Sequence, residues 1–121
     1  MAITSTDTPV EDASRETCTP GAAGQLIDPE EVELMASKLK AVADPMRLQM
    51  LHLIRQAPNG ELCVCDLTNR LALSQPTVSH HLKILTTAGL LKRQRRGTWA
   101  WFSVVPDALR ELQESLFPPA G

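Results

Sequence analysis

The sequence of 121 residues has no long hydrophobic run, since no apolar stretch approaches the roughly 18 residues needed to span a bilayer. Its N-terminus also lacks the basic cluster followed by an apolar segment that marks a secretory signal. These absences argue against a membrane or secreted protein, and we expect a cytoplasmic location with no membrane partner. A glycine-rich phosphate-binding loop is missing too, which is one reason not to expect an enzyme.

Cysteine is scarce and odd in number. The three cysteines are Cys18, Cys63 and Cys65, and in a reducing compartment this count argues against a disulfide framework. Cys63 and Cys65 lie one residue apart, a spacing that in a cytosolic protein favours metal ligands or a redox pair. The alternative is that they are buried and act as small hydrophobic residues.

Acidic residues are absent from residues 67–106, although the whole chain carries a net charge of −2. Residues 1–33 are the opposite, with eight acids and one base. The six bases of the acid-free window are Arg70, Lys83, Lys92, Arg93, Arg95 and Arg96. Such a window inside an acidic protein is typical of a surface that binds a polyanion, and a solvated basic face is the alternative.

The length of the chain indicates a single domain. Residues 1–27 are rich in Thr, Ser, Pro, Gly and acids without apolar periodicity, which predicts a flexible N-terminal arm carrying Cys18. We expect residues 28–117 to form the folded domain and residues 118–121 to form a tail.

Helix and strand signals follow one another along the folded part. Asp28-Pro29 and Asp44-Pro45 each place a capping residue before a proline, and they predict the starts of two helices. Helical patterns at 64–71 and 75–88, with a break at 72–74, predict a helix-turn-helix. Strand-like segments at 90–95 and 98–105, with a turn at 96–97, predict a hairpin. A last helix starts at Pro106-Asp107.

This order predicts a mainly α (α+β) fold, a winged helix-turn-helix with a β-hairpin wing. The first and last helices carry apolar faces that have no obvious partner in a three-helix core. We therefore expect a homodimer formed through these two helices. Two-fold symmetry of this kind suits the half-sites of a palindromic DNA sequence.

The second helix of the helix-turn-helix carries the polar side chains expected to contact DNA. Val78, Leu82 and Leu85 recur at helical spacing and should face the core, which leaves short polar groups facing outward. From this helix we expect DNA contacts by Ser74, Gln75, Thr77, Ser79, His80 and Lys83. From the wing we expect phosphate or minor-groove contacts by Arg93, Arg95 and Arg96.

Four motifs occur in order between about residues 30 and 115. They are Leu-Lys-Ala-Val-Ala-Asp-Pro-Met-Arg-Leu-Gln-Met-Leu (39–51), Glu-Leu-Cys-Val-Cys-Asp-Leu (61–67), Leu-Ser-Gln-Pro-Thr-Val-Ser-His-His-Leu-Lys-Ile-Leu (73–85) and Arg-Gly-Thr-Trp-Ala-Trp-Phe (96–102). Together they resemble the ArsR/SmtB family of metalloregulatory repressors. The Cys-Val-Cys-Asp-Leu form resembles the arsenic-sensing branch of that family.

The resemblance implies a homodimeric repressor that binds double-stranded operator DNA, an imperfect palindrome, when it is metal-free. As(III) or Sb(III), the inducer, would bind the cysteine thiolates and release the operator, which turns on arsenic-resistance genes. The same fold triggered by another soft metal, Cd(II), Pb(II) or Zn(II), or by thiol oxidation, is the alternative. The zinc site that some relatives build on the last helix is not expected, because this helix has no histidine.

The cysteine pair supplies two of the three sulfurs that As(III) takes, since thiolates select soft centres. In some family members the third thiol follows on the same helix, near the position of Asn69, where this chain has none. Cys18 is the remaining candidate as a third ligand to Cys63 and Cys65, and a two-thiolate site with a solvent ligand is the fallback.

The spacing of the pair sets a geometric condition on binding. Residues two apart on a regular helix point about 200° apart, so Cys63 and Cys65 cannot share one ion within an intact helix. Either the helix begins after Cys63, or binding unwinds its first turn. In the second case, capture of the metalloid would distort the first helix of the motif and disfavour the DNA-binding state.

Overall fold

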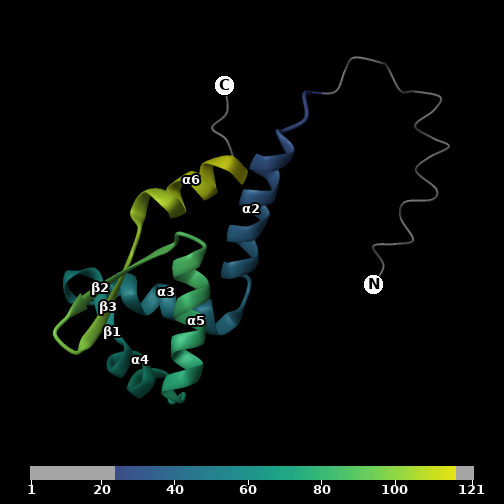
Figure 1. Cartoon of the computed structure of the whole chain (residues 1–121). Coiled ribbons are helices and arrows are strands. Elements are labelled where there is room, and N and C mark those ends of the chain that lie inside the picture. The colour runs from purple at the N-terminus through teal and green to yellow at the C-terminus, as the bar shows by residue number, and fades with distance from the viewer. Residues whose placement is uncertain (1–23, 117–121) are drawn as a thin grey trace.

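The computed structural model describes residues 24–116, and the expected arm with Cys18 and the expected tail lie outside the described residues except for residues 24–27. Figure 1 shows how the elements are arranged. Along the chain they are α2 (Pro29–Val42), α3 (Pro45–Gln56), the 3-10 turn η2 (Pro58–Gly60), β1 (Glu61–Cys63), α4 (Val64–Leu71), α5 (Gln75–Thr87), β2 (Leu91–Arg96), β3 (Trp99–Val104) and α6 (Pro106–Leu116). The predicted winged helix-turn-helix is confirmed.

Side-chain caps start the helices where the sequence places them. The Asp28 carboxylate accepts from the Glu30 amide at 3.3 Å, and the Asp44 carboxylate accepts from the amides of Met46 and Arg47 at 3.0 and 3.1 Å. Each aspartate thereby satisfies a backbone donor that the first helical turn leaves without a partner. The backbone hydrogen bond from Arg47 is the main reason that the pKa of Asp44 lies below its ordinary value.

The helix-turn-helix follows the predicted boundaries closely. Helix α4 ends at Leu71 and is followed by its C-cap Ala72, which adopts a left-handed conformation with φ of 55°, and α5 begins at Gln75. Three residues of α5 predicted to face the core are fully or almost fully buried, namely Val78, Leu82 and Leu85. They join Met50, Ile54, Leu67 and Leu90 in one hydrophobic core. This core fixes the orientation of α5 and leaves its opposite face to solvent.

The wing is wider than the sequence predicts, because it belongs to a sheet of three strands in the order β1-β3-β2. Strand β1 pairs with β3 in antiparallel register, with Cys63 opposite Trp101. Strand β1 was not predicted from the sequence, because a strand of three residues is too short to show the alternation of apolar and polar residues that marks a strand. Its effect is to tie the cysteine segment to the wing.

The hairpin turn differs by one residue from its expected place. Arg96 pairs with Trp99, so the two-residue turn is Gly97-Thr98 and not Arg96-Gly97. Gly97 adopts a φ of 64°, the left-handed conformation that such turns require and that glycine adopts without steric cost. The expected turn at 96–97 was wrong because it gave glycine the second position of the turn instead of the first.

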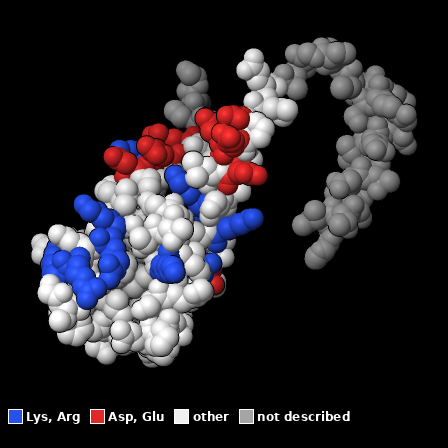
Figure 2. All heavy atoms as spheres, viewed as in Figure 1, with Lys and Arg blue, Asp and Glu red and all other residues white. Residues whose placement is uncertain are grey.

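Charge and exposed apolar area are segregated on the surface. In Figure 2, lysine and arginine gather over the β2–β3 hairpin, while aspartate and glutamate gather over α6 and the start of α2. The acidic end also exposes apolar side chains, with Val32, Leu34 and Leu116 at 43%, 59% and 40% of their area. Within residues 24–116, no helix combines the length and apolar character needed to cross a membrane.

Candidate thiolate site and nucleic-acid interface

The two cysteines lie at the junction of β1 and α4. Cys63 is the last residue of β1 and the N-cap of α4, with an extended backbone at φ −94° and ψ 169°, and Cys65 lies in the first turn of the helix. The ligand atoms of Cys63, Cys65 and Asp66 all lie within 4.8 Å of one another. The first of the two alternatives therefore holds: the helix begins after Cys63, and the thiols approach each other without unwinding it.

Asp66 holds Cys63 in place through two hydrogen bonds. Its carboxylate accepts from the Cys63 backbone N–H at 3.3 Å and from the Cys63 thiol at 3.4 Å. The backbone bond is half of a capping box, in which the third helical residue reaches back to the N-cap. Asp66 thus connects the start of α4 to the sulfur of its own cap.

The environment of Cys63 favours the protonated thiol. The residue is buried, with 4% of its area exposed. Burial raises the pKa of the Cys63 thiol above its ordinary value, because the thiolate loses hydration, and the side chains of Cys65 and Asp66 raise it further. A ligand that binds the Cys63 sulfur must therefore displace or consume the thiol proton.

Two sulfurs and one carboxylate oxygen suit a thiophilic centre better than a hard cation, which prefers an all-oxygen shell. Cys63, Cys65 and Asp66 are the one such group of three within the described part of the chain. Cys18 lies outside the described residues, so its predicted role as third sulfur ligand stays a prediction.

The exposed face of α5 carries the polar residues that the sequence assigns to DNA. Gln75, Thr77, Ser79, His80 and Lys83 are all exposed. Ser74 is the N-cap of α5, where its hydroxyl accepts from the Thr77 amide at 3.4 Å and donates to the Thr77 hydroxyl at 2.9 Å. Ser74 therefore has a structural role besides its predicted contact with DNA.

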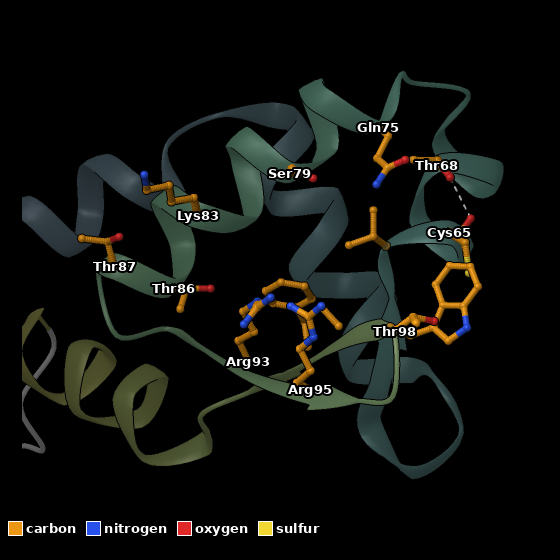
Figure 3. Close-up of a pocket in the computed structure, with 14 residues that line it drawn as sticks. Cys65, Thr68, Gln75, Ser79, Lys83, Thr86, Thr87, Arg93, Arg95 and Thr98 are labelled. Atoms are coloured by element: carbon orange, nitrogen blue, oxygen red, sulfur yellow. Dashed lines mark hydrogen bonds between the residues drawn. The ribbon is translucent and has the colours of Figure 1, made fainter.

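A hollow of about 650 Å³ lies between α5, the start of α4 and the wing. In Figure 3 Ser79 and Lys83 lie on α5 and Arg93 and Arg95 lie on β2, with the Lys83 side chain extending away from the two arginines. Its lining includes Cys65, Gln75, Ser79, Lys83, Arg93 and Arg95. Among the described residues that line this hollow, none is acidic. Cys65 thus lies in the same basic recess as the predicted DNA contacts.

Arg96 lies apart from the other two wing arginines. Residues alternate between the faces of a strand, so Arg96 points away from the face that carries Arg93 and Arg95. Its guanidinium donates to both carboxylate oxygens of Glu61 at 2.6 and 2.9 Å and lies 5.2 Å from the centre of a Trp101 ring. The hydrogen bond from Arg96 lowers the pKa of Glu61. This arginine fastens the wing to β1 and is not placed with the predicted DNA contacts.

Arg47 is a half-buried residue whose role the sequence analysis missed. Its guanidinium donates to the Ala41 carbonyl oxygen at the end of α2 at 2.6 Å, and its Nη1 lies 3.2 Å from Nδ1 of His81 on α5. It therefore connects α2 to the helix that carries the polar face. The motif Asp-Pro-Met-Arg was understood only as a helix start, and sequence alone does not show which carbonyls a long side chain will reach.

Comparisons with known proteins agree with this architecture. The model of the family described as bacterial regulatory protein, arsR family, matches residues 44–93. An uncharacterized HTH-type transcriptional regulator of Methanocaldococcus jannaschii is 43% identical over 83 residues, which cover 69% of this chain and 91% of the relative. An arsenical resistance operon repressor of Bacillus subtilis is 40% identical over 75 residues, covering 62% and 70% of the two chains.

A solved structure shares the fold. The homodimeric winged helix-turn-helix DNA-binding domain of a possible ArsR-family transcriptional regulator from Mycobacterium bovis superposes with a TM-score of 0.63 at 27% identity. The match covers 78% of this chain and 86% of that chain. Family and fold are those of DNA-binding transcriptional regulators. The chain belongs to the arsR family of bacterial regulatory proteins.

Proposed function

We propose that this protein is a homodimeric transcriptional repressor that binds operator DNA and releases it when As(III) or Sb(III) binds Cys63 and Cys65. The observation that carries the proposal is the approach of these two sulfurs and the Asp66 carboxylate at the start of the first helix of the DNA-binding motif. A thiophilic ligand bound there contacts the element that supports α5. The name of the Bacillus subtilis relative supports arsenic as the inducer.

The exposed polar face of α5 and the wing supply the DNA contacts. In a winged helix-turn-helix the second helix enters the major groove, where short polar side chains such as Gln75 and Ser79 can reach base edges. Lys83, Arg93 and Arg95 form a basic border around the same recess and fit phosphates. We assign Ser74, Thr77 and His80 to the same interface, with the cap role of Ser74 limiting its reach.

The dimer forms through α2 and α6, as the sequence predicts. Val32, Leu34 and Leu116 expose apolar area on these helices, and a groove of about 420 Å³ between them is lined by Leu34, Met35 and Leu112. The homodimeric relative from Mycobacterium bovis supports this assignment. A two-fold dimer would read two half-sites of an imperfect palindrome. Because operator DNA is found in the cytoplasm of a bacterium, we propose a cytoplasmic location for the protein.

The chemistry of arsenous acid fits a pair of cysteine side chains. Two As–O bonds break and two As–S bonds form, each hydroxide leaving as water with one thiol proton, so charge balances and no electron is transferred. The third coordination position of the arsenic atom would keep a hydroxide or would take the thiol of Cys18 from the N-terminal arm. A divalent cation such as Cd(II) must instead displace the Cys63 proton into solution, which the raised pKa of Cys63 opposes.

The test uses a DNA duplex selected from random sequences by the metal-free protein and labelled with fluorescein. Sodium arsenite is titrated into the protein–DNA complex, and fluorescence anisotropy measures the fraction of duplex still bound. Arsenite should release the duplex from the wild type, and Cys63→Ser and Cys65→Ser should abolish release while DNA binding persists. His52→Ala, on the exposed surface of α3, is the matched control and should respond as the wild type does.

Three further arms separate the alternatives. A Cys18→Ser variant that needs much more arsenite assigns the third sulfur to the arm, and an unchanged response assigns a solvent ligand. Release by cadmium, lead or zinc chloride but not by arsenite would replace the proposed inducer. Release by hydrogen peroxide alone would identify thiol oxidation as the trigger.

A further inference from the structure

The two cysteines of the thiolate site differ in what surrounds them. Cys63 is buried beneath the strand–helix junction, whereas Cys65 is half-buried and lines the basic hollow between α5 and the wing. Any molecule that fills this hollow therefore covers the route to the pair from that side.

The lining of the hollow indicates what fills it. Lys83, Arg93 and Arg95 surround it, hydroxyl groups of Ser79 and Thr86 face it, and none of its described lining residues is acidic. Positive charge beside hydrogen-bonding hydroxyls fits the phosphate backbone of nucleic acid. The hollow is also bounded by α5 (Figure 3), the helix that the proposed function places in the major groove, so bound DNA would lie across its mouth.

We propose that operator DNA and As(III) exclude each other at this hollow, so that the metalloid reaches Cys65 only in the DNA-free protein. The inference rests on the proposed function and adds how release occurs. An arsenic centre bound to Cys65 would occupy part of the hollow that bound DNA covers.

Mutual exclusion and allosteric expulsion predict different kinetics. If arsenite binds only free protein, it traps dimers that have already left the operator, and it cannot raise the dissociation rate constant of the complex. The apparent affinity for DNA then falls by the factor 1 + [L]/Kd, about 100-fold when arsenite is present at about 100 times its Kd. If arsenite instead bound the complex and distorted it, dissociation would accelerate with arsenite concentration.

The decisive measurement uses the full chain and stopped-flow anisotropy with the labelled operator duplex. Dissociation is started by excess unlabelled operator, by sodium arsenite, or by both together. We expect one rate constant in all three cases once arsenite is saturating, with no further rise at higher arsenite. A rate constant that increases with arsenite above the value set by unlabelled operator would overturn the inference. Arsenite that releases nothing at equilibrium would instead overturn the proposed function.

A second measurement tests the shielding directly. In a Cys18→Ser/Cys63→Ser variant that still binds the duplex, alkylation of Cys65 by N-ethylmaleimide is followed by mass spectrometry. Duplex at about ten times its Kd should slow the reaction about tenfold, because only the free fraction reacts. The matched control is a variant in which Cys18, Cys63 and Cys65 are all replaced by serine and a single cysteine is introduced at an exposed position of α3 by His52→Cys. The rate at which this cysteine is alkylated should not change when the duplex is bound. Equal alkylation of Cys65 with and without bound duplex would contradict the inference.

Discussion

The α5–wing end and the α2–α6 end of the molecule differ in charge and in exposed apolar area. The first presents Lys83, Arg93 and Arg95 around a recess without acidic lining residues in the part of the chain described. The second presents apolar side chains beside a set of acids, which are Glu30, Glu31, Glu33, Asp107, Glu111 and Glu114. We therefore propose a different partner for each end, a polyanion for the first and a second copy of the chain for the second.

The cysteine pair belongs to the first of these ends. Cys65 lines the basic recess, and no cysteine among residues 24–116 lies on α2 or α6. If a metalloid binds this pair as proposed, we expect it to act on the DNA-binding end and to leave the proposed dimer interface intact. Substitutions that affect one end and not the other can test this separation.

The largest effect is expected from Leu34→Glu at the dimer end. Leu34 is 59% exposed, so the charge costs the folded monomer little, but it would be buried in the proposed interface. We expect a monomer in sedimentation velocity and an operator affinity at least about 100-fold lower, because two linked half-site contacts become one. His52→Glu, which adds the same charge on α3, should remain dimeric. A dimer of unchanged Kd in Leu34→Glu would place the interface elsewhere.

A smaller effect is expected from Arg93→Ala/Arg95→Ala at the DNA end. Each arginine that neutralises a phosphate contributes about 0.9 to the slope of log K against log salt, so the double variant should lose almost 2 from this slope. Anisotropy titrations at several salt concentrations measure it. The dimer and the arsenite dissociation constant of the free protein should stay unchanged. An unchanged slope would remove these two arginines from the phosphate contacts.

Arg96→Ala is the matched comparison on the same strand. Because Arg96 pairs with Glu61 on the other face, the salt slope should match that of the wild type, while the wing should loosen from β1. Faster amide hydrogen exchange in β1 and β3 would report that loosening. If the slope of log K against log salt were instead reduced as in the Arg93→Ala/Arg95→Ala variant, Arg96 would be one of the residues that contact DNA.

Ser74 separates helix capping from DNA contact. Ser74→Ala should lower the free energy of unfolding by about 1 kcal/mol, because the start of α5 loses its cap. Ser74→Asp should restore stability, since aspartate caps equally well, but should weaken DNA binding by placing a carboxylate near phosphates. Denaturant titration and anisotropy measure the two effects. Full operator affinity in Ser74→Asp would show that position 74 does not approach the DNA.

The smallest effect is a pH dependence at the Glu61–Arg96 pair. The folded-state pKa of Glu61 is below the value of about 4.5 for the free side chain, so the unfolded chain binds more protons as the pH falls. The contribution of the pair is present above pH 4.5 and is lost as the pH falls through the folded pKa. The difference in denaturation midpoint between wild type and Arg96→Met should therefore shrink in acid. A difference that is equal at pH 7 and pH 3 would contradict this.

Local signals made most of the fold predictable. Capping aspartates, helix-starting prolines and the spacing of Val78, Leu82 and Leu85 each act within a few residues, so the sequence contains them in full. Strand β1 was missed because its existence depends on pairing with β3, about 40 residues away. The same strand decided the geometry of the site, since it keeps Cys63 extended and brings its sulfur near Cys65.

The candidate site was predictable by residue type but not by orientation. Cysteine chemistry named Cys63 and Cys65, yet sequence left open whether a helix separated them. Strand alternation could have distinguished Arg96 from Arg93 and Arg95, but the Glu61 partner depends on β1 and could not be foreseen. The connection from Arg47 to His81 is likewise a contact between distant segments.

The position of Cys63 also limits how such a regulator can change its ligand. One residue ends a strand, caps a helix through the Asp66 bond and offers a sulfur. A substitution there that alters ligand preference also alters the stability of the DNA-binding motif. Cys65 neither ends a strand nor caps a helix, and its side chain lines the recess between α5 and the wing. New ligand preferences should therefore arise more readily through position 65 and its neighbours on the recess than through position 63.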